Sequence, residues 1–394
     1  MYKHPIYYTV RQRIEEPRKF IQVLMGPRQV GKSTVIKQVL DDIDIPYKFF
    51  AADFVPASNS NWIAECWEAA RMLQAVKGGG VLLVIDEIQK IDNWSEVVKK
   101  LWDEDTFHGR NIKVVLLGSS RILLKRGLSE SLAGRFEEIR MSQWGYPEMK
   151  ECFGYDVNQY LFFGGYPGSA SLMAEQSRFE SYIESSIVDA SINKDILFDS
   201  RISKPALLRQ TFELAAAYSG RLLSLTKLLG QLQDAGNTST LAHYLHLLQE
   251  ACLVEGLQKY AVDLARSKGS IPKFQVFDNS LKVIYQPFTF EEVRLNPAKW
   301  GMVFESGIGA YIMCQSFIHR FEVFYWRERN MEVDFVLRKK GMTVALEIKS
   351  NKEKSSKGLE IFKEQFKPHR TLIIGEGGLA AEEFLAMPLA NLFK

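Results

Sequence analysis

The first 141 residues alternate between short apolar runs and amphipathic stretches. Strand-like runs occupy residues 20–25, 47–53, 81–85, 113–117 and 136–141. The run at 81–85 is apolar at every position, as expected for a parallel strand that is buried on both faces. Helical spacing marks residues 34–40 and 62–73, and the glycines at 78–80 end the second helix. Strands that alternate with helices predict a three-layer α/β sandwich with right-handed crossovers.

Beyond Pro147 the pattern becomes mainly helical, interrupted by a Gly-Gly-Tyr-Pro-Gly turn at 164–168. Residues 149–204 are predicted to form a helical lid or connector. Residues 205–285 contain three helical stretches and then two strand-like runs, at 207–218, 226–232, 239–251, 253–260 and 273–277. A helix, a second helix, a turn, a third helix and a β-hairpin in this order predict a winged helix-turn-helix.

The last segment, 286–394, has the pattern of a small α/β domain. A helix that begins near Gly301 is followed by three strand-like runs, a helix and a further strand, at 321–326, 332–337, 343–348, 358–366 and 371–374. With residues 1–148 as the first domain, the pattern therefore predicts four segments, bounded at 148, 204 and 285.

The amino-acid composition indicates a soluble protein and not a membrane protein. The chain has 394 residues, of which 46% are hydrophobic and 25% are charged, values typical of a soluble globular protein of two or three domains. The net charge of +3 is too small for the electrostatic field of the whole protein to indicate nucleic-acid binding. The four cysteines form no CxxC pair, and no run approaches the length of a membrane span. We therefore expect a cytoplasmic protein with no membrane partner.

The strongest motif lies between the first strand and the first helix. Its residues match GxxxxGK[ST] and are Gly26, Pro27, Arg28, Gln29, Val30, Gly31, Lys32 and Ser33, followed by Thr34. Glycines let backbone N–H groups surround a phosphate, and a helix N-terminus favours negative charge. In such a loop Lys32 reaches the β- and γ-phosphates, and the Ser33 hydroxyl ligates Mg²⁺. The motif predicts a P-loop that binds ATP with Mg²⁺.

A second motif supports the first independently. The apolar strand at 81–85 ends in Asp86 and Glu87. Asp86 is placed to complete the Mg²⁺ shell and Glu87 to polarise the attacking water. Together the two motifs predict an ATPase.

With both motifs in place, the first segment resembles AAA+ ATPases. That resemblance implies a residue at the tip of the fourth strand that senses the γ-phosphate, either Ser119 or Ser120. It also implies that Arg135, in Leu132-Ala133-Gly134-Arg135, acts as an arginine finger on a neighbouring subunit. An always-charged guanidinium suits that task because charge develops on the transferred phosphoryl group. The resemblance therefore implies a homo-oligomer, either a ring or a dimer.

The predicted winged helix suggests DNA as a partner. Four residues at the start of its third helix are candidates to face a groove, Asn237, Thr238, Thr240 and His243. Arg266 and Lys268, between the two strands, would contact phosphates. The third helix contains no arginine or lysine, so a structural role or a protein contact remains the alternative for this domain.

The C-terminal segment resembles the PD-(D/E)xK restriction-endonuclease-like fold. Asp334 lies in one predicted strand, and Glu347-Ile348-Lys349 ends the next. Glu347 and Lys349 share a face, since strand side chains repeat every two residues. The resemblance implies that Asp334 and Glu347 share Mg²⁺, that Lys349 assists the attacking water, and that Glu305 is an outer carboxylate.

Taken along its length, the chain resembles archaeal-type AAA+ ATPases with a C-terminal restriction-endonuclease-like domain. The resemblance implies a P-loop AAA+ sandwich, then a helical lid with a winged helix-turn-helix, then a small α/β nuclease-like domain. Three functions follow from it. The first is an ATP-driven protein that binds and remodels DNA, including branched DNA such as four-way junctions. The others are a nucleotide-dependent switch for protein partners and an ATP-gated, Mg²⁺-dependent DNA nuclease.

Overall fold

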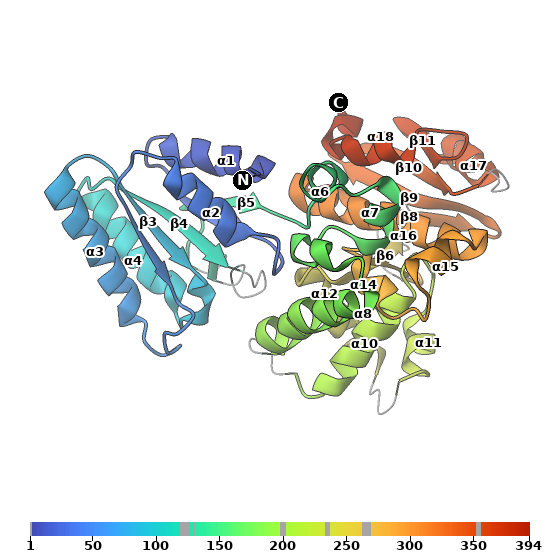
Figure 1. The fold of residues 1–394 in the computed structure, drawn as a ribbon, viewed down its shortest axis with the longest axis horizontal. Coiled ribbons are helices and arrows are strands. Elements are labelled where there is room, and N and C mark those ends of the chain that lie inside the picture. The colour runs from blue at the N-terminus through green and yellow to red at the C-terminus, as the bar shows by residue number, and fades with distance from the viewer. Residues whose placement is uncertain are drawn as a thin grey trace. The chain divides into compact units, whose positions relative to one another are not determined.

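The computed structural model describes residues 2–118, 124, 127–128, 131–197, 202–232, 237–261, 269–351 and 356–394. The chain divides into two compact units, Met1–Met141 and Ser142–Lys394. Figure 1 shows the elements of each unit.

The N-terminal unit is built on a five-stranded sheet in the order β2-β3-β4-β1-β5, in which every pairing is parallel. Its strands are β1 (Ile21–Met25), β2 (Tyr47–Ala51), β3 (Val81–Asp86), β4 (Ile112–Gly118) and β5 (Phe136–Arg140). This confirms the parallel α/β sheet predicted from the apolar runs. Because all strands run the same way, the residues that follow β1, β3 and β4 emerge at one edge of the sheet.

Helices cover both faces of this sheet (Figure 1). They are α1 (Pro5–Glu15), α2 (Lys32–Asp41), α3 (Asn61–Lys77) and α4 (Trp94–Phe107), with a short 3₁₀ turn, η1 (Ile88–Lys90), after β3. The helix α1 was not predicted, because its sequence mixes aromatic and charged residues without a clear apolar stripe. It is nevertheless anchored, since the Tyr7 hydroxyl donates to the Asp42 carboxylate at 2.6 Å.

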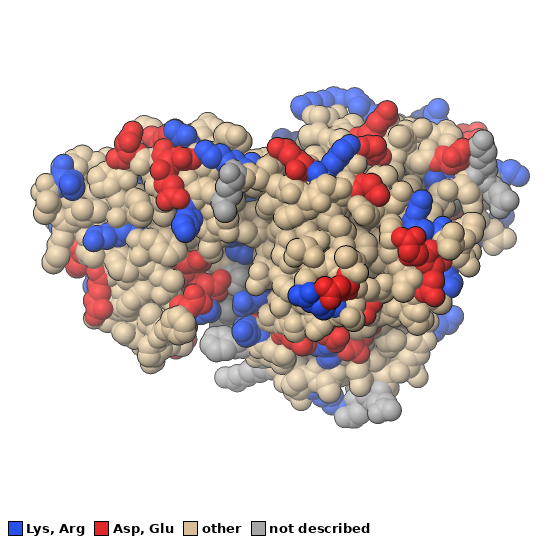
Figure 2. All heavy atoms as spheres, in the orientation of Figure 1, with Lys and Arg blue, Asp and Glu red and all other residues tan. Residues whose placement is uncertain are grey.

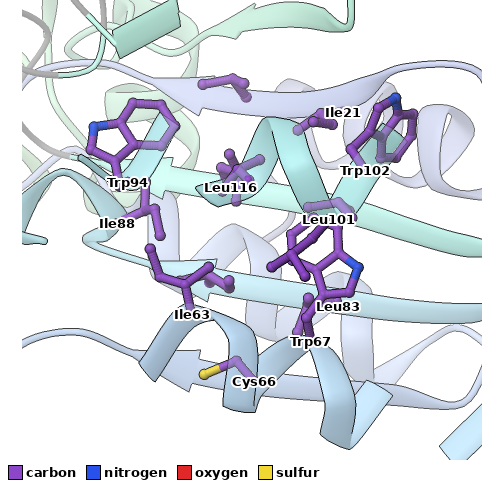
Figure 3. Close-up of a cluster of buried hydrophobic side chains, with 14 of the residues drawn as sticks. Ile21, Ile63, Cys66, Trp67, Leu83, Ile88, Trp94, Leu101, Trp102 and Leu116 are labelled. Carbon is purple, nitrogen blue, oxygen red and sulfur yellow. The ribbon is translucent and has the colours of Figure 1, made fainter. Parts of the chain in front are cut away.

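The face covered by α3 and α4 holds a large apolar cluster (Figure 3). Trp67, Trp94 and Trp102 of these helices belong to it as core residues, Trp62 is partly buried against it, and Trp67 is fully buried. The Trp67 indole N–H donates to Asp105 at 2.7 Å, and the same carboxylate accepts from Arg71 at 2.8 Å. A buried carboxylate is therefore paired, as burial of a charge requires, and it fixes α3 against α4.

The C-terminal unit is built on a six-stranded sheet in the order β11-β10-β9-β8-β6-β7. Its strands are β6 (Val254–Lys259), β7 (Lys273–Val276), β8 (Glu322–Glu328), β9 (Met331–Lys339), β10 (Met342–Lys349) and β11 (Arg370–Gly375). Parallel pairing of Gln258 with Phe324 joins β6 to β8. The hairpin expected in the winged helix and the strands expected in the nuclease-like domain thus share one sheet.

Many helices surround this sheet (Figure 1). Before the first strand come α6 (Tyr146–Phe153), α7 (Val157–Phe163), η2 (Pro167–Leu172), α8 (Gln176–Tyr182), the π-helical η3 (Ile183–Asp189) and η4 (Ser191–Ile196), α10 (Pro205–Ala217), α11 (Leu225–Leu229) and α12 (Thr238–Glu250). After β7 come α14 (Ser280–Val283), α15 (Phe290–Arg294), the long α16 (Pro297–His319), α17 (Lys357–Phe366), α18 (Ala381–Ala386) and the 3₁₀ turn η5 (Leu389–Phe393). Along the parts of the chain described, no helix is both long enough and apolar enough to cross a bilayer.

The Gly-Gly-Tyr-Pro turn has a structural explanation. Gly164 has a φ of 76°, and a Cβ on it would lie 1.9 Å from a carboxylate oxygen of Asp278. A Cβ on Gly165 would lie 2.0 Å from the Trp144 carbonyl oxygen. The Gly165 N–H donates to Asp278 at 2.7 Å, and burial raises the pKa of that carboxyl to about 6. The two glycines therefore allow close packing of the turn on Asp278.

Candidate functional site

The loop between β1 and α2 has the backbone that its glycines predict. Gly31 precedes the first turn of α2 with a φ of 95°, in the left-handed region that favours glycine. A Cβ on Gly26 would lie 1.8 Å from the carbonyl oxygen of Met141, so a side chain there has no room. The loop is thus tightly turned and ends at the N-terminus of α2, where backbone N–H groups favour an anion.

Lys32 lies in the first turn of α2 and is buried. Its ammonium donates to the carbonyl oxygens of Gly26 at 3.0 Å and Pro27 at 2.7 Å. The side chain therefore folds back over the loop, where its charge is available to a phosphate group bound by the loop.

Ser33 and Asp86 meet at the same edge of the sheet. The Ser33 hydroxyl donates to the Asp86 carboxylate at 2.8 Å, although the two residues lie in α2 and at the end of β3. Burial raises the pKa of Asp86 above its usual value, while the hydrogen bond from Ser33 and the charge of Lys32 lower it. A buried carboxylate beside a hydroxyl is a favourable place for a cation.

These two oxygen ligands fit Mg²⁺. The described residues contain no group of three or more histidine, cysteine, aspartate or glutamate side chains arranged to hold a metal. Mg²⁺ does not need such a group, because it commonly binds through one or two protein oxygens together with water and substrate phosphates. The pair of Ser33 and Asp86 suits that mode of binding and not a site made of protein ligands alone.

Glu87 is held in a defined position just after β3. It has a φ of 54°, and its N–H donates to the Asp86 carboxylate at 2.9 Å. Its own carboxylate accepts from the Gln89 amide at 2.7 Å and lies 3.9 Å from the Lys90 ammonium. Lys90 in turn donates to Asp53, which follows β2, at 2.5 Å. Glu87 is therefore oriented by neighbours at the candidate site.

Gln89 is a residue that the sequence analysis missed. It is only 6% exposed, and a Cβ on Gly118, at the end of β4, would lie 2.3 Å from its amide oxygen. Among the residues that the structure describes, that oxygen has no hydrogen-bond partner. The only sequence signal is a polar residue two positions after Glu87. The geometry makes Gln89 a positioning residue for Glu87.

Replacing Gln89 with leucine is expected to lower kcat for ATP hydrolysis about tenfold or more, because a hydrogen bond to a charged group contributes about 1.5–3 kcal/mol. KM for ATP should stay unchanged, since Gln89 contacts Glu87 and not the loop. Steady-state kinetics separate the two parameters. Gln74→Leu removes an exposed glutamine amide of α3 and serves as the control. Equal loss in both variants, or a raised KM with unchanged kcat, would contradict the assignment.

Arg135 lies away from the loop of its own chain. Its carbonyl oxygen accepts from the N–H of Ile21, at the start of β1, whereas the loop follows the end of β1. Strands rise about 3.3 Å per residue, so the length of β1 separates the two. The guanidinium makes two contacts with Asp103, at 2.7 and 2.9 Å. Arg135 is thus at the opposite edge of the sheet, and its role as an arginine finger stays a prediction. Ser119 and Ser120 lie outside the described residues.

The DNA-contact candidates are only partly described. The Asn237 side chain caps α12 by accepting from the Thr240 N–H at 2.9 Å, which gives both residues a structural task. Thr238 and His243 are exposed. Arg266 and Lys268 lie outside the described residues. The groove-facing role of these six residues stays a prediction.

Two of the nuclease-like candidates, Glu305 and Asp334, lie close to a buried lysine, Lys273. Leu346 pairs with Phe335, which brings Glu347 and Asp334 to neighbouring positions on β10 and β9, and both are buried. The ammonium of Lys273, in β7, lies 2.7 Å from Glu305 and 3.8 Å from an Asp334 carboxylate oxygen. The other Asp334 carboxylate oxygen accepts from the Ile348 N–H at 2.7 Å.

Lys273 therefore supplies a positive charge beside Asp334, one of the two carboxylates predicted to share Mg²⁺. It is fully buried, and it also lies 3.7 Å from Glu332 and 4.9 Å from the centre of the Phe335 ring. Burial alone lowers the pKa of Lys273, but the nearby carboxylates outweigh burial and raise it. Lys349, which ends β10, is half-buried. The cluster is one of ion pairs, and its role as a nuclease site stays a prediction.

Three parts of the chain match models of known protein families. Residues 18–150 match the family model described as "AAA domain". The N-terminal unit is an AAA-type, ATPase-like domain. This confirms the resemblance for that part of the chain. Residues 154–289 and 300–391 match models described as "Domain of unknown function (DUF8612)" and "Domain of unknown function (DUF4143)". The winged helix and the restriction-endonuclease-like domain stay predictions.

The similarity to individual proteins extends along most of the chain. A protein of Haemophilus influenzae described as uncharacterized is 24% identical over 384 residues, which cover 91% of this chain and 89% of that protein. One of Methanocaldococcus jannaschii, also described as uncharacterized, is 22% identical over 369 residues, 86% of this chain and 78% of that protein. Among solved structures, the Walker-type ATPase of Pyrococcus abyssi is 13% identical, covering 71% of this chain and 94% of that one with a TM-score of 0.46.

Proposed function

We propose that this protein binds ATP with Mg²⁺ at the loop Gly26–Thr34, hydrolyses it, and uses the cycle to bind and remodel DNA. The observation that carries the ATPase part is the contact of 2.8 Å between Ser33 and Asp86, with the ammonium of Lys32 folded over the adjacent loop. Three residues from two separate motifs thus meet at one edge of the sheet, as phosphate binding requires.

Each residue has a distinct task in this proposal. Lys32 and the loop N–H groups neutralise the phosphates, and Ser33 and Asp86 hold the metal. Mg²⁺ supplies electrostatic stabilisation of the charge that develops on the phosphoryl group. Glu87, oriented by Gln89, accepts the proton of the attacking water.

Arg135 supports an oligomeric form. Arg135 lies at the edge of the sheet opposite its own loop, so in this proposal its guanidinium acts on the nucleotide of a second copy. A ring or a dimer would then join hydrolysis to a change in how the copies contact each other. The pairing of Arg135 with Asp103 would be exchanged for contact with the phosphate.

DNA is the proposed partner of the C-terminal unit. The order of α10, α11, α12, β6 and β7 is the order expected of a winged helix, and Leu222, between α10 and α11, forms an antiparallel bridge with Lys273 of β7. Branched DNA, such as a four-way junction, is the proposed form. We do not propose cleavage, because Lys273 already pairs with Glu305 and Asp334, two of the three carboxylates of the predicted nuclease site.

The test is steady-state ATP hydrolysis with no DNA and with single-stranded, duplex or four-way-junction DNA, at low and moderate salt. Stimulation by one form, weakened by salt, is expected because phosphate contacts release counterions. Hydrolysis that no DNA changes would remove the DNA part and favour a nucleotide-dependent switch for protein partners. The lack of any lysine or arginine in α12 is the observation that favours this second function.

A further inference from the structure

A pocket in the C-terminal unit combines several positive charges. It has a volume of about 810 Å³, within the range of ligand-binding pockets. Lys227 of α11, Lys259 at the end of β6, Arg327 near the end of β8 and Arg329 in the turn after β8 line it. The lining residues that the structure describes include no aspartate or glutamate.

This concentration of positive charge departs from the balanced composition of the chain. The chain has 50 lysine and arginine residues against 47 aspartate and glutamate residues. On the face that Figure 2 displays, basic and acidic side chains are interspersed. Gathering four cations from separate segments raises their mutual repulsion, which a bound polyanion would relieve. Arg327 lies 3.9 Å from Glu332, an acid that also lies 3.7 Å from Lys273.

The neutral lining of the pocket also suits phosphate. Ser224, Ser270, Tyr218 and Gln231 provide hydroxyl and amide groups, the neutral donors that proteins direct at phosphate oxygens. The Ser270 hydroxyl accepts from the Lys259 N–H at 2.9 Å, which fixes the serine at the end of β6. Such a mixture of guanidinium, ammonium and hydroxyl groups matches a phosphodiester backbone.

The position of the pocket indicates nucleic acid as the occupant. Lys227 belongs to α11, which packs against α12 in the segment proposed to contact DNA. Because α12 contains no lysine or arginine, contacts to the phosphates must come from other elements. We infer that this pocket binds the phosphodiester backbone of a nucleic acid strand, through Lys227, Lys259, Arg327 and Arg329. The inference rests on the DNA-binding part of the proposed function.

The experiment measures binding of labelled oligonucleotides to the full chain by fluorescence anisotropy. Single-stranded DNA, duplex DNA and RNA of equal length are titrated from about 50 to about 300 mM KCl. The pocket variants are Lys227→Gln with Lys259→Gln, and Arg327→Gln with Arg329→Gln. Arg178→Gln with Lys363→Gln removes two charges from α8 and α17 and is the matched control.

Each pocket variant is expected to lose at least about tenfold in affinity at low salt, with the slope of log K against log salt smaller by about 2. The control should keep both values, and all variants should keep the unfolding midpoint of the wild type. Comparison of the affinities for the three oligonucleotides shows whether the pocket binds the backbone of DNA or that of RNA.

The outcomes separate this inference from the proposed function. If DNA stimulates hydrolysis in the wild type and the pocket variants bind it with unchanged affinity and slope, the pocket inference is overturned and the proposed function stands. If the wild type binds no nucleic acid, the DNA part of the proposal fails and the inference fails with it. Preference for polyglutamate over every oligonucleotide would assign the pocket to an acidic protein segment instead and overturn the inference.

Discussion

We expect the Lys32→Ala variant to hydrolyse ATP ~10²–10³-fold more slowly than the wild type, the loss typical of removing one group that stabilises developing charge. The ammonium of Lys32 is buried and lies over the loop, where it contacts two backbone carbonyl oxygens. Alanine would leave those carbonyls without this donor and a bound phosphate without its closest positive charge. Steady-state hydrolysis, with binding of a fluorescent nucleotide measured in parallel, gives the result.

Lys37 provides the matched control. It lies in the same helix, α2, but is exposed, so Lys37→Ala removes an equal charge without reaching the loop. That variant should hydrolyse ATP at the rate of the wild type. Unchanged hydrolysis in Lys32→Ala would falsify the assignment of the loop as the catalytic site, whatever the protein does with DNA.

The geometry of the candidate nucleotide site could be predicted from the sequence, because its parts are local. The loop is contiguous, and Asp86 and Glu87 end a strand whose burial was evident from its composition. A parallel sheet then brings both motifs to one edge, so their meeting followed from strand direction alone. Gln89 was missed because its importance depends on packing against the end of β4, which no local pattern indicates.

The C-terminal unit was harder to predict, because its contacts join distant segments. The pairing of β6 with β8 connects residues more than sixty positions apart, so the sharing of one sheet leaves no periodic signal. Lys273 stands at the start of a strand-like run, where a lysine ordinarily faces water. It is buried instead, because three acidic residues from α16 and β9 lie within 4 Å of its ammonium.

The burial of Lys273 among three carboxylates predicts a large loss of stability when its charge is removed. Replacing Lys273 with methionine, which has a similar length but no charge, is expected to destabilise the C-terminal unit by about 3–5 kcal/mol. Asp334 and Glu305 would lose the ammonium that compensates their negative charges, and Asp334 is only 2% exposed. Hydrogen exchange of β9 and β10 measures the loss locally, and urea denaturation measures it for the unit.

A charge-matched rescue distinguishes electrostatics from packing. If uncompensated carboxylates cause the loss, adding Glu305→Gln and Asp334→Asn to Lys273→Met should restore much of the stability, because a neutral cluster needs no cation. If lost packing causes it, the added substitutions should bring no recovery. Unchanged exchange in the single variant would contradict a stabilising role for the ion-pair cluster. Hydrolysis at the P-loop reports separately whether the N-terminal unit stays folded, so a loss confined to β9 and β10 would locate the effect of Lys273 in the C-terminal sheet.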